Sequence, residues 1–286
     1  MSSPGFKITA FILLTALFSS FFYALIIEAG SLSANSGLYV LGLMWAPGAA
    51  AIVVRLVTQR NLRGQGWALG PVSHLFLSYV LPILYAAPVY ALVWGFAFGG
   101  LSTVAWLPAA TDVGFPASPL TALAVMASAG VLLSLVSATG EEIGWRGLLV
   151  PELAKITSFR NTSLISGAIW ALYHAPLLIF ADYNSGSTPL WFSLTCFTLM
   201  VFGLSFIMAW LRLSSGSLWP AALLHATHNL FVQGVFDTAT LDRGFTRYVT
   251  TEFGIGIALT VALAAWLIAR RPLPPSRIRP AAETAA

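Results

Sequence analysis

The chain has 286 residues, of which 58% are hydrophobic and only 8% are charged, and its mean hydropathy is +0.83. Roughly a quarter of the residues in a soluble domain are charged, so this composition excludes a soluble globular protein and indicates a polytopic α-helical membrane protein. The net charge of +4 is consistent either with nucleic-acid binding or with the charge bias that orients membrane helices.

Apolar runs long enough to cross a hydrocarbon core of roughly 30 Å recur along the chain. We expect them to form one all-α transmembrane domain over residues 1–269. The first run is longer than the 7 to 15 apolar residues of a secretory signal, so it is predicted to be a retained helix. The eight predicted spans are 8–27, 38–56, 75–98, 120–149, 163–180, 190–211, 218–233 and 254–269.

The basic residues predict the orientation of these spans. If the N-terminus is cytoplasmic, the non-cytoplasmic segments hold only Arg243 and Arg247 of the fourteen basic residues. This distribution follows the positive-inside bias, so it predicts cytoplasmic termini and requires no nucleic-acid partner. Residues 270–286, rich in arginine and proline, are expected to form a disordered cytoplasmic tail that touches anionic lipid. The arginine-rich, lysine-poor composition favours a prokaryotic cell membrane.

The fourth span contains an unusual pair of acids in the stretch "EEIGWR". An ionisable side chain inside a span is costly and tends to face the bundle interior or a wet cavity. Glu142 and Arg146 are one helical turn apart and can pair, whereas Glu141 is rotated by about 100°. The sequence therefore predicts one carboxylate held by arginine and one left free for chemistry. A lone acid near a helix end would instead be an interfacial charge.

Two later spans contribute imidazoles. His174 follows Trp170 by one turn and precedes Pro176, which is expected to kink the fifth span or open its hydrogen bonding. In the seventh span, "HATHN" places His225 and Asn229 on one face. Taken singly, His174 could be a satisfied core residue, and the seventh-span pair could serve interhelical hydrogen bonding.

Depth is the reason to combine these groups. At ~1.5 Å per residue, His174, His225 and Asn229 are predicted to lie between the cytoplasmic surface and mid-membrane. The fourth span is longer than a simple crossing, so its glutamates can lie below the same surface. We therefore expect one wet pocket that opens to the cytoplasm.

Three motifs on spaced helices carry a resemblance to a known family: Glu-Glu-x-x-x-Arg in "EEIGWR", aromatic-x-x-x-His in "WALYH" and His-x-x-x-Asn in "HATHN". Over about residues 120–235 the chain resembles the CPBP (Abi) intramembrane proteases, which include type II CAAX prenyl endopeptidases. Trp170 stands where that family more often has phenylalanine. The resemblance implies that the catalytic residues are Glu141, His174, His225 and Asn229, with Glu142 and Arg146 as supports.

These residues could catalyse hydrolysis of a peptide bond near a membrane-tethered C-terminal segment, which could be lipidated or CAAX-like. Glu141, assisted by His174, would take the proton of an attacking water, and His225 and Asn229 would donate to the oxyanion. Two histidines and a glutamate are also a recognised zinc set. A divalent zinc ion held by Glu141, His174 and His225 therefore stays an open alternative to metal-independent chemistry.

Other functions compete with this one. Gly203-Leu204-Ser205 faintly resembles the serine motif of rhomboid proteases, although that mechanism would leave both glutamates without a role. The alternative class is a protein that is not an enzyme. It could be an inactive family member that acts as a membrane immunity or scaffold protein, or it could be a transporter, since proton relays also use intramembrane Glu and His. The single cysteine, Cys196, is expected to pack in an apolar helix.

Overall fold

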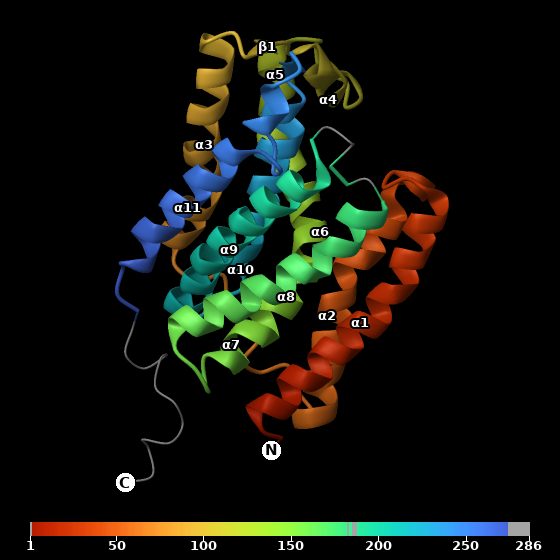
Figure 1. The fold of residues 1–286 in the computed structure, drawn as a ribbon. Coiled ribbons are helices and arrows are strands. Elements are labelled where there is room, and N and C mark those ends of the chain that lie inside the picture. The colour runs from red at the N-terminus through yellow and green to blue at the C-terminus, as the bar shows by residue number, and fades with distance from the viewer. Residues whose placement is uncertain (1, 182, 185–187, 274–286) are drawn as a thin grey trace.

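A computed structural model describes residues 2–181, 183–184 and 188–273, and most of this chain is helical (Figure 1). Residues 274–286 of the predicted tail lie outside the described residues. The long helices are α1 (Pro4–Ala29), α2 (Leu38–Gln59), α3 (Val72–Gly95), α8 (Phe159–Phe180), α9 (Leu190–Ser215), α10 (Trp219–His228) and α11 (Ile255–Ala269). Between α3 and α8 a longer helical stretch contains α5 (Pro119–Val125), η3 (Met126–Gly130), α6 (Val131–Gly144), η4 (Trp145–Leu149) and α7 (Val150–Leu153).

Each of the eight predicted apolar runs is largely helical, which confirms the all-α membrane class. Six helical stretches among the described residues are long and apolar enough to cross a membrane: Pro4–Ala29, Ala34–Gln59, Val72–Gly95, Pro119–Leu153, Phe159–Phe180 and Leu190–Ser215. The helix α11 is shorter, with 15 residues. The stretch formed by α10 and η5 (Asn229–Asp237) is not among the six, and its polar residues lower its hydropathy. Eight crossings are therefore not confirmed.

Short elements fill the connections at one end of the bundle. The strands β1 (Gly99–Leu101) and β2 (Thr240–Asp242) pair antiparallel, with Gly100 opposite Leu241. This pairing joins the connection after α3 to the connection before α11. The other short elements are η1 (Ala34–Gly37), η2 (Val104–Trp106), α4 (Leu107–Thr111) and η6 (Thr246–Tyr248).

Serine caps fix where two of the helices begin. Ser3 precedes the proline that opens α1, and its side chain accepts a hydrogen bond from the Phe6 amide. Ser158 does the same for α8 by accepting from the Asn161 amide. Such caps satisfy amides that have no partner inside the helix. As a result α8 begins at Phe159, earlier than the predicted start of the span at residue 163.

The helical stretches that carry the polar motifs are locally widened. Residues of η4 follow the paired glutamates in π-helical geometry, and η5 has the same geometry and begins at Asn229. The π-helix is rare and frequently occurs at functional sites. In contrast, α8 continues through Pro176 to Phe180. A third π-helical stretch, η3, lies at Met126–Gly130, away from these motifs. Two of the three π-helical stretches thus begin beside the glutamates and at Asn229, and none lies at the proline.

Both ends of the described chain lie at the same end of the bundle (Figure 1). Lys7, near the start of α1, donates to Gln59 at the end of α2 over 3.0 Å, and its Nζ lies 3.8 Å from Glu152 of α7. Leu273 and Phe159, at the start of α8, pack against the same buried cluster, which includes Val150 of α7. This side of the bundle is called the terminal end below, and the opposite side, which carries η1, β1 and β2, the far end.

The bundle packs around α9 and α10, and its outer helices expose apolar side chains. The helix α9 is the most buried of the six membrane-crossing stretches, and α10 contacts α3, α6 and α9. Among the exposed apolar side chains are Leu13, Leu17, Phe76, Leu84, Leu132, Leu133, Leu172, Leu259 and Leu263. These side chains need a lipid environment, because exposure of so much apolar surface to water is unfavourable.

Glycines allow α2 and α6 to approach each other closely. A Cβ atom added at Gly48 would lie 2.5 Å from the carbonyl oxygen of Gly140, and one added at Gly144 would lie 2.8 Å from the carbonyl oxygen of Pro47. Small residues at such crossings are a common basis of helix packing in membranes. Close packing of α2 therefore constrains the part of α6 that carries the glutamates.

We predict that Gly48→Ala destabilises the protein by about 1–3 kcal/mol, the usual cost of overpacking a filled site. The measurement is thermal unfolding of the purified protein in detergent. Gly95→Ala is the matched control, because a Cβ atom there meets nothing within 4 Å. Equal melting temperatures for the two variants would contradict the tight α2–α6 crossing.

Candidate active site

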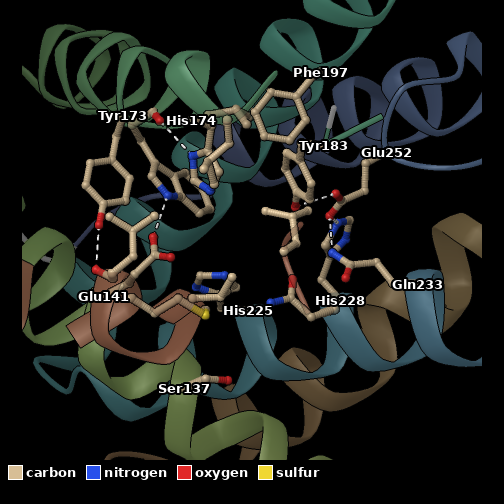
Figure 2. A pocket seen from close by; sticks show the side chains of 18 of the residues that line it. Ser137, Glu141, Tyr173, His174, Tyr183, Phe197, His225, His228, Gln233 and Glu252 are labelled. Carbon is tan, nitrogen blue, oxygen red and sulfur yellow. Dashed lines mark hydrogen bonds and ion pairs between the residues drawn. The ribbon is translucent and has the colours of Figure 1, made fainter. Parts of the chain in front are cut away.

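The four residues predicted to be catalytic line one cavity of about 520 Å³. Glu141 comes from α6, His174 from α8, His225 from α10 and Asn229 from the start of η5. Figure 2 shows the glutamate and the two histidines facing the same space. The structure thus brings three sequence motifs, separated by up to 88 positions, around one hollow.

Glu141 is buried, and two indole groups hold its carboxylate. Only 2% of the residue is exposed. Its Oε2 atom accepts a hydrogen bond of 2.9 Å from the Nε1 atom of Trp145 and a second of 2.9 Å from the Nε1 atom of Trp170. Hydrogen bonds to the charged form of a carboxylate stabilise that form. Both indoles bind the same oxygen, so Oε1 is the oxygen left for chemistry in the cavity.

Trp170 lies at the centre of the site. Its ring centroid lies 5.3 Å from that of His225 and 5.8 Å from that of His174, and both rings meet it edge-on. The guanidinium of Arg146 lies over the same indole, 4.4 Å from its centroid. Trp170 stands where the family that the motifs resemble more often has phenylalanine. Its indole N–H also binds the proposed base, a role that phenylalanine could not fill.

Glu142 pairs with Arg146, as the sequence predicted, and also contacts His225. Its Oε1 atom accepts from Nη1 of Arg146 at 2.8 Å and lies 3.0 Å from Nδ1 of His225. Glu142 and Arg146 are both fully buried. A carboxylate accepts hydrogen bonds, so Nδ1 of His225 carries the proton in this contact. The contact between Glu142 and His225 therefore joins α6 to α10 and fixes the orientation of the His225 ring, and with it the position of Nε2.

The ring of His174 is oriented by its own helix. Its Nδ1 atom lies 2.9 Å from the carbonyl oxygen of Trp170. A carbonyl can only accept, so Nδ1 carries a proton, and in the neutral ring Nε2 keeps its lone pair. Phe197 and Tyr183 pack against the same ring. His174 is thus held as a hydrogen-bond acceptor, or a base, at the cavity wall.

The depth of His174 differs from the prediction. Counted from Phe159, it lies ~22 Å along α8 and only ~9 Å from the end of that helix at Phe180. It therefore lies in the half of the helix nearer the far end, and the earlier start of α8 adds four residues on the other side of it. The expected cytoplasmic opening is not confirmed.

A second polar cluster lines the same cavity and was not predicted. Glu252, from the connection before α11, accepts hydrogen bonds from Gln233 over 2.6 Å and from Tyr183 over 3.0 Å. His228 lies between Glu252, 3.3 Å away, and the hydroxyl of Tyr85, 2.6 Å away. The sequence offered one signal, the intramembrane His228, but no spacing connects it to Glu252.

Burial alone would raise the pKa of the Glu252 carboxyl. The neighbouring His228, Gln233 and Tyr183 outweigh that effect and lower the pKa below its usual range. Glu252 is therefore ionised at neutral pH, and the cavity holds a second carboxylate across from Glu141 (Figure 2).

The serine that resembles a rhomboid nucleophile lies elsewhere. Ser205 is completely buried and does not line the cavity. Its hydroxyl faces Gly167 of α8, where an added Cβ atom would lie 3.3 Å away, and it has no hydrogen-bond partner among the described residues. No histidine of the described residues hydrogen-bonds to it, so this geometry does not favour a serine protease. Cys196 is buried in α9 as expected.

The fit of a metal ion can be tested on the ligand positions. A catalytic zinc site needs three side chains whose donor atoms lie about 2 Å from one point. Within the described part of the chain, no three His, Cys, Asp or Glu side chains form such a group. Glu141, His174 and His225 share a cavity, but they are not arranged as one ligand set.

Comparison with known proteins confirms the resemblance that the three motifs indicated. A family model described as type II CAAX prenyl endopeptidase Rce1-like matches residues 123–231. CAAX prenyl protease 2 of Methanococcus maripaludis is 31% identical over 104 residues, which cover 35% of this chain and 38% of that protein. The match thus spans well under half of the relative. All four candidate catalytic residues lie inside the segment that matches the family model, and Glu252 lies outside it.

We predict that Arg146→Met destabilises the protein by about 3–5 kcal/mol, because it leaves Glu142 buried without its main counter-charge. Thermal unfolding in detergent measures the effect. The double variant Glu142→Gln, Arg146→Met should recover a large part of the loss, since it removes both charges. A double variant no more stable than Arg146→Met alone would contradict the pairing.

Proposed function

We propose that this protein is an intramembrane endopeptidase, similar to type II CAAX prenyl endopeptidases, that hydrolyses a peptide bond with water activated by Glu141 and His174. The observation that carries the proposal is the convergence of Glu141, His174, His225 and Asn229 from four helical elements on one cavity. The match to the Rce1-like family over the segment that holds these residues supports it.

In the proposed reaction Glu141 is the general base. Its Oε2 atom is bound by Trp145 and Trp170, which orient the carboxylate and keep Oε1 for the attacking water. Nε2 of His174 is an acceptor and can orient or share the proton of the same water. As the water oxygen bonds to the scissile carbonyl carbon, its proton passes to Glu141, which later returns it to the leaving amine. Such acid–base catalysis contributes about 10²- to 10⁴-fold.

His225 and Asn229 are proposed to stabilise the oxyanion. Asn229 can donate from its side-chain amide, and His225 can donate from Nε2 when its ring is protonated. The contact of Nδ1 with Glu142, 3.0 Å away, stabilises that imidazolium. Loss of one well-placed donor typically costs about 3–4 kcal/mol of transition-state stabilisation. Glu142 and Arg146 thus act through His225, as positioning residues that do not touch the substrate.

The lining of the cavity suits an apolar peptide segment. Leu41, Leu43, Leu177, Phe197, Met200, Val201 and Leu204 are among the lining residues, so a membrane-tethered segment could bury apolar side chains beside the scissile bond. The relative's name assigns that protein a CAAX prenyl substrate. For this chain a lipidated, CAAX-like C-terminal segment is therefore one candidate substrate, and an unlipidated apolar segment is the other.

We predict that Glu141→Gln lowers turnover of a membrane-tethered peptide by about 10²- to 10⁴-fold, because glutamine cannot accept the proton of water. The assay uses purified protein in detergent with lipidated and unlipidated peptides, and mass spectrometry of the products. Glu152→Gln is the matched control. Glu152 is equally buried but pairs with Lys155 and Lys7 at the terminal end, outside the cavity.

The control should keep most of the activity and the fold. Wild-type turnover that survives Glu141→Gln would refute the proposed base. If the chain is instead a scaffold or immunity protein, its effect in the cell should survive Glu141→Gln.

A second prediction concerns metal dependence. The reaction proposed here uses no step on a metal, because the candidate ligands do not form one ligand set. We expect turnover to survive dialysis against a strong chelator and to gain nothing from added zinc. Loss of turnover on chelation, followed by recovery with zinc, would replace this mechanism with a metal-dependent one at Glu141, His174 and His225.

A further inference from the structure

The cavity has a second polar wall, on the side opposite Glu141 (Figure 2). It consists of Tyr183, His228, Gln233 and Glu252 and is called the acidic wall below. His228 and Gln233 come from the helical stretch of α10 and η5, and Glu252 comes from the connection before α11. The proposed hydrolysis uses none of these four side chains. They nevertheless line the same space as Glu141.

The buried glutamates differ in their partners according to where they lie. Four glutamates of the described chain are buried. Glu142 and Glu152 lie outside the cavity lining, and each pairs with lysine or arginine. Glu141 and Glu252 line the cavity, and within the described residues neither forms an ion pair with lysine or arginine. A buried acid is normally paired, so the missing partner of Glu252 calls for an explanation.

The imidazole of His228 does not neutralise Glu252. Its Nδ1 atom lies 2.6 Å from the hydroxyl of Tyr85, and its Nε2 atom lies 3.3 Å from Oε1 of Glu252. Tyr85 is buried, and its hydroxyl has no other hydrogen-bond partner among the described residues, so this hydroxyl donates to Nδ1. A ring that accepts at Nδ1 and carries its proton on Nε2 is neutral. His228 is therefore a neutral neighbour of Glu252.

Glu252 thus carries its negative charge among neutral donors. Gln233 donates to its Oε1 atom and Tyr183 to its Oε2 atom. A carboxylate oxygen has about two acceptor sites, so Oε2 can accept one more hydrogen bond from a ligand. Hydrogen bonds between two charged groups are the strong ones, and a cation would compensate the buried charge. The ligand that completes this environment best is therefore a cation.

A smaller polar pocket adjoins the acidic wall. Its volume is about 160 Å³, and Tyr183, Gln233 and Glu252 line both this pocket and the main cavity. Its other lining residues are Asn184, Asp237, Arg247, Thr251 and Phe253. Arg247 is half-exposed and lies 3.5 Å from Asp242, so another acid already pairs with it. Water in this polar pocket can hydrate a charged group that binds at Glu252.

We propose that the acidic wall is a substrate subsite, in which Glu252 binds an ammonium or guanidinium group of the peptide. This inference rests on the proposed function and narrows the substrate class to an apolar segment that carries a lysine or arginine close to the scissile bond. The lining agrees with this choice, because its described residues include two carboxylates and no lysine or arginine. Glu252 contacts the substrate in this proposal and determines specificity, without taking part in the reaction.

Peptide binding to the Glu141→Gln protein tests the subsite without turnover. The peptides share one apolar sequence and an acetylated N-terminus, and they differ at a single residue, which is lysine, methionine or glutamate. The varied residue is moved along the peptide one position at a time. A further peptide with methionine and a free N-terminus offers an ammonium group from the end of the chain. Fluorescence anisotropy in detergent gives the dissociation constants.

We expect lysine to improve affinity about tenfold over methionine at one position or two adjacent ones, the usual gain from a hydrogen bond that involves charged groups, and glutamate to weaken it. Adding Glu252→Gln should abolish the preference for lysine and leave the affinity for the methionine peptide unchanged. Glu252→Asp keeps the charge and should retain part of the preference. Glu152→Gln is the matched control, because Glu152 is buried outside the cavity lining, and it should retain the full preference.

Two results would overturn the proposal. The first is equal affinity for lysine and methionine at every position, which is measured with the acidic wall intact and so does not require the Glu252→Gln protein to fold. The second is an equal loss of affinity for all peptides in a folded Glu252→Gln variant, because Glu252 would then only support the cavity. A gain confined to the peptide with the free N-terminus would support the subsite with a terminal ammonium as its ligand.

Hydrolysis of the same peptides by the wild-type protein is a separate readout. We expect lysine at the preferred position to raise kcat/KM about tenfold over methionine. If the chain is not a peptidase, no peptide is cleaved while the preference for lysine in binding persists. If the subsite is wrong, hydrolysis persists and the lysine and methionine peptides are cleaved with equal kcat/KM.

Discussion

The buried carboxylate of Glu142 is the interaction on which the arrangement of the site depends. It shares one oxygen between Arg146 on its own helical stretch and His225 on α10. An unpaired charge at this depth would be very costly, so the three side chains must stay together. The guanidinium of Arg146 also stacks on Trp170 of α8. One buried charge cluster thereby joins α6, α8 and α10, which supply Glu141, His174 and His225.

This arrangement assigns different tasks to two adjacent glutamates. Glu142 binds cations and is completely buried, whereas Glu141 binds two neutral indole donors and lines the cavity. The Oε1 atom of Glu142 is occupied by Arg146 and His225, whereas both indoles bind Oε2 of Glu141 and leave its Oε1 free to contact a water. The rotation of about 100° between neighbouring helical residues is what allows one helical turn to present both environments.

Much of the fold and of the candidate site could be predicted from the sequence, because membrane crossing and intramembrane charge leave strong local signals. The eight apolar runs are largely helical, and the pairing of Glu142 with Arg146 follows from their spacing. The π-helical geometry of η4 and η5 could not be predicted, since it depends on packing between helices. The hydrogen-bond partners of Glu141 were also missed. Trp145 and Trp170 read as apolar packing residues in the sequence, and only the folded structure shows that their indole N–H groups point at this carboxylate.

The burial of two arginines could not be foreseen for a related reason. Arg55 and Arg212 were counted as charges that orient the chain, but the structure buries both of them against backbone carbonyls. The same limit applies to Glu252, which reaches the cavity from a connection beyond the motif-bearing helices. Such contacts link positions far apart in the sequence, and only the packed bundle brings them together.

The most direct test of the account is an experimental structure of the Glu141→Gln variant with an uncleaved apolar peptide bound. The account predicts a backbone carbonyl of the peptide within about 3.2 Å of Asn229 or His225, with a water between its carbon and the residue 141 side chain. A peptide bound outside this cavity, or one whose backbone stays remote from residue 141 and His174, would contradict it.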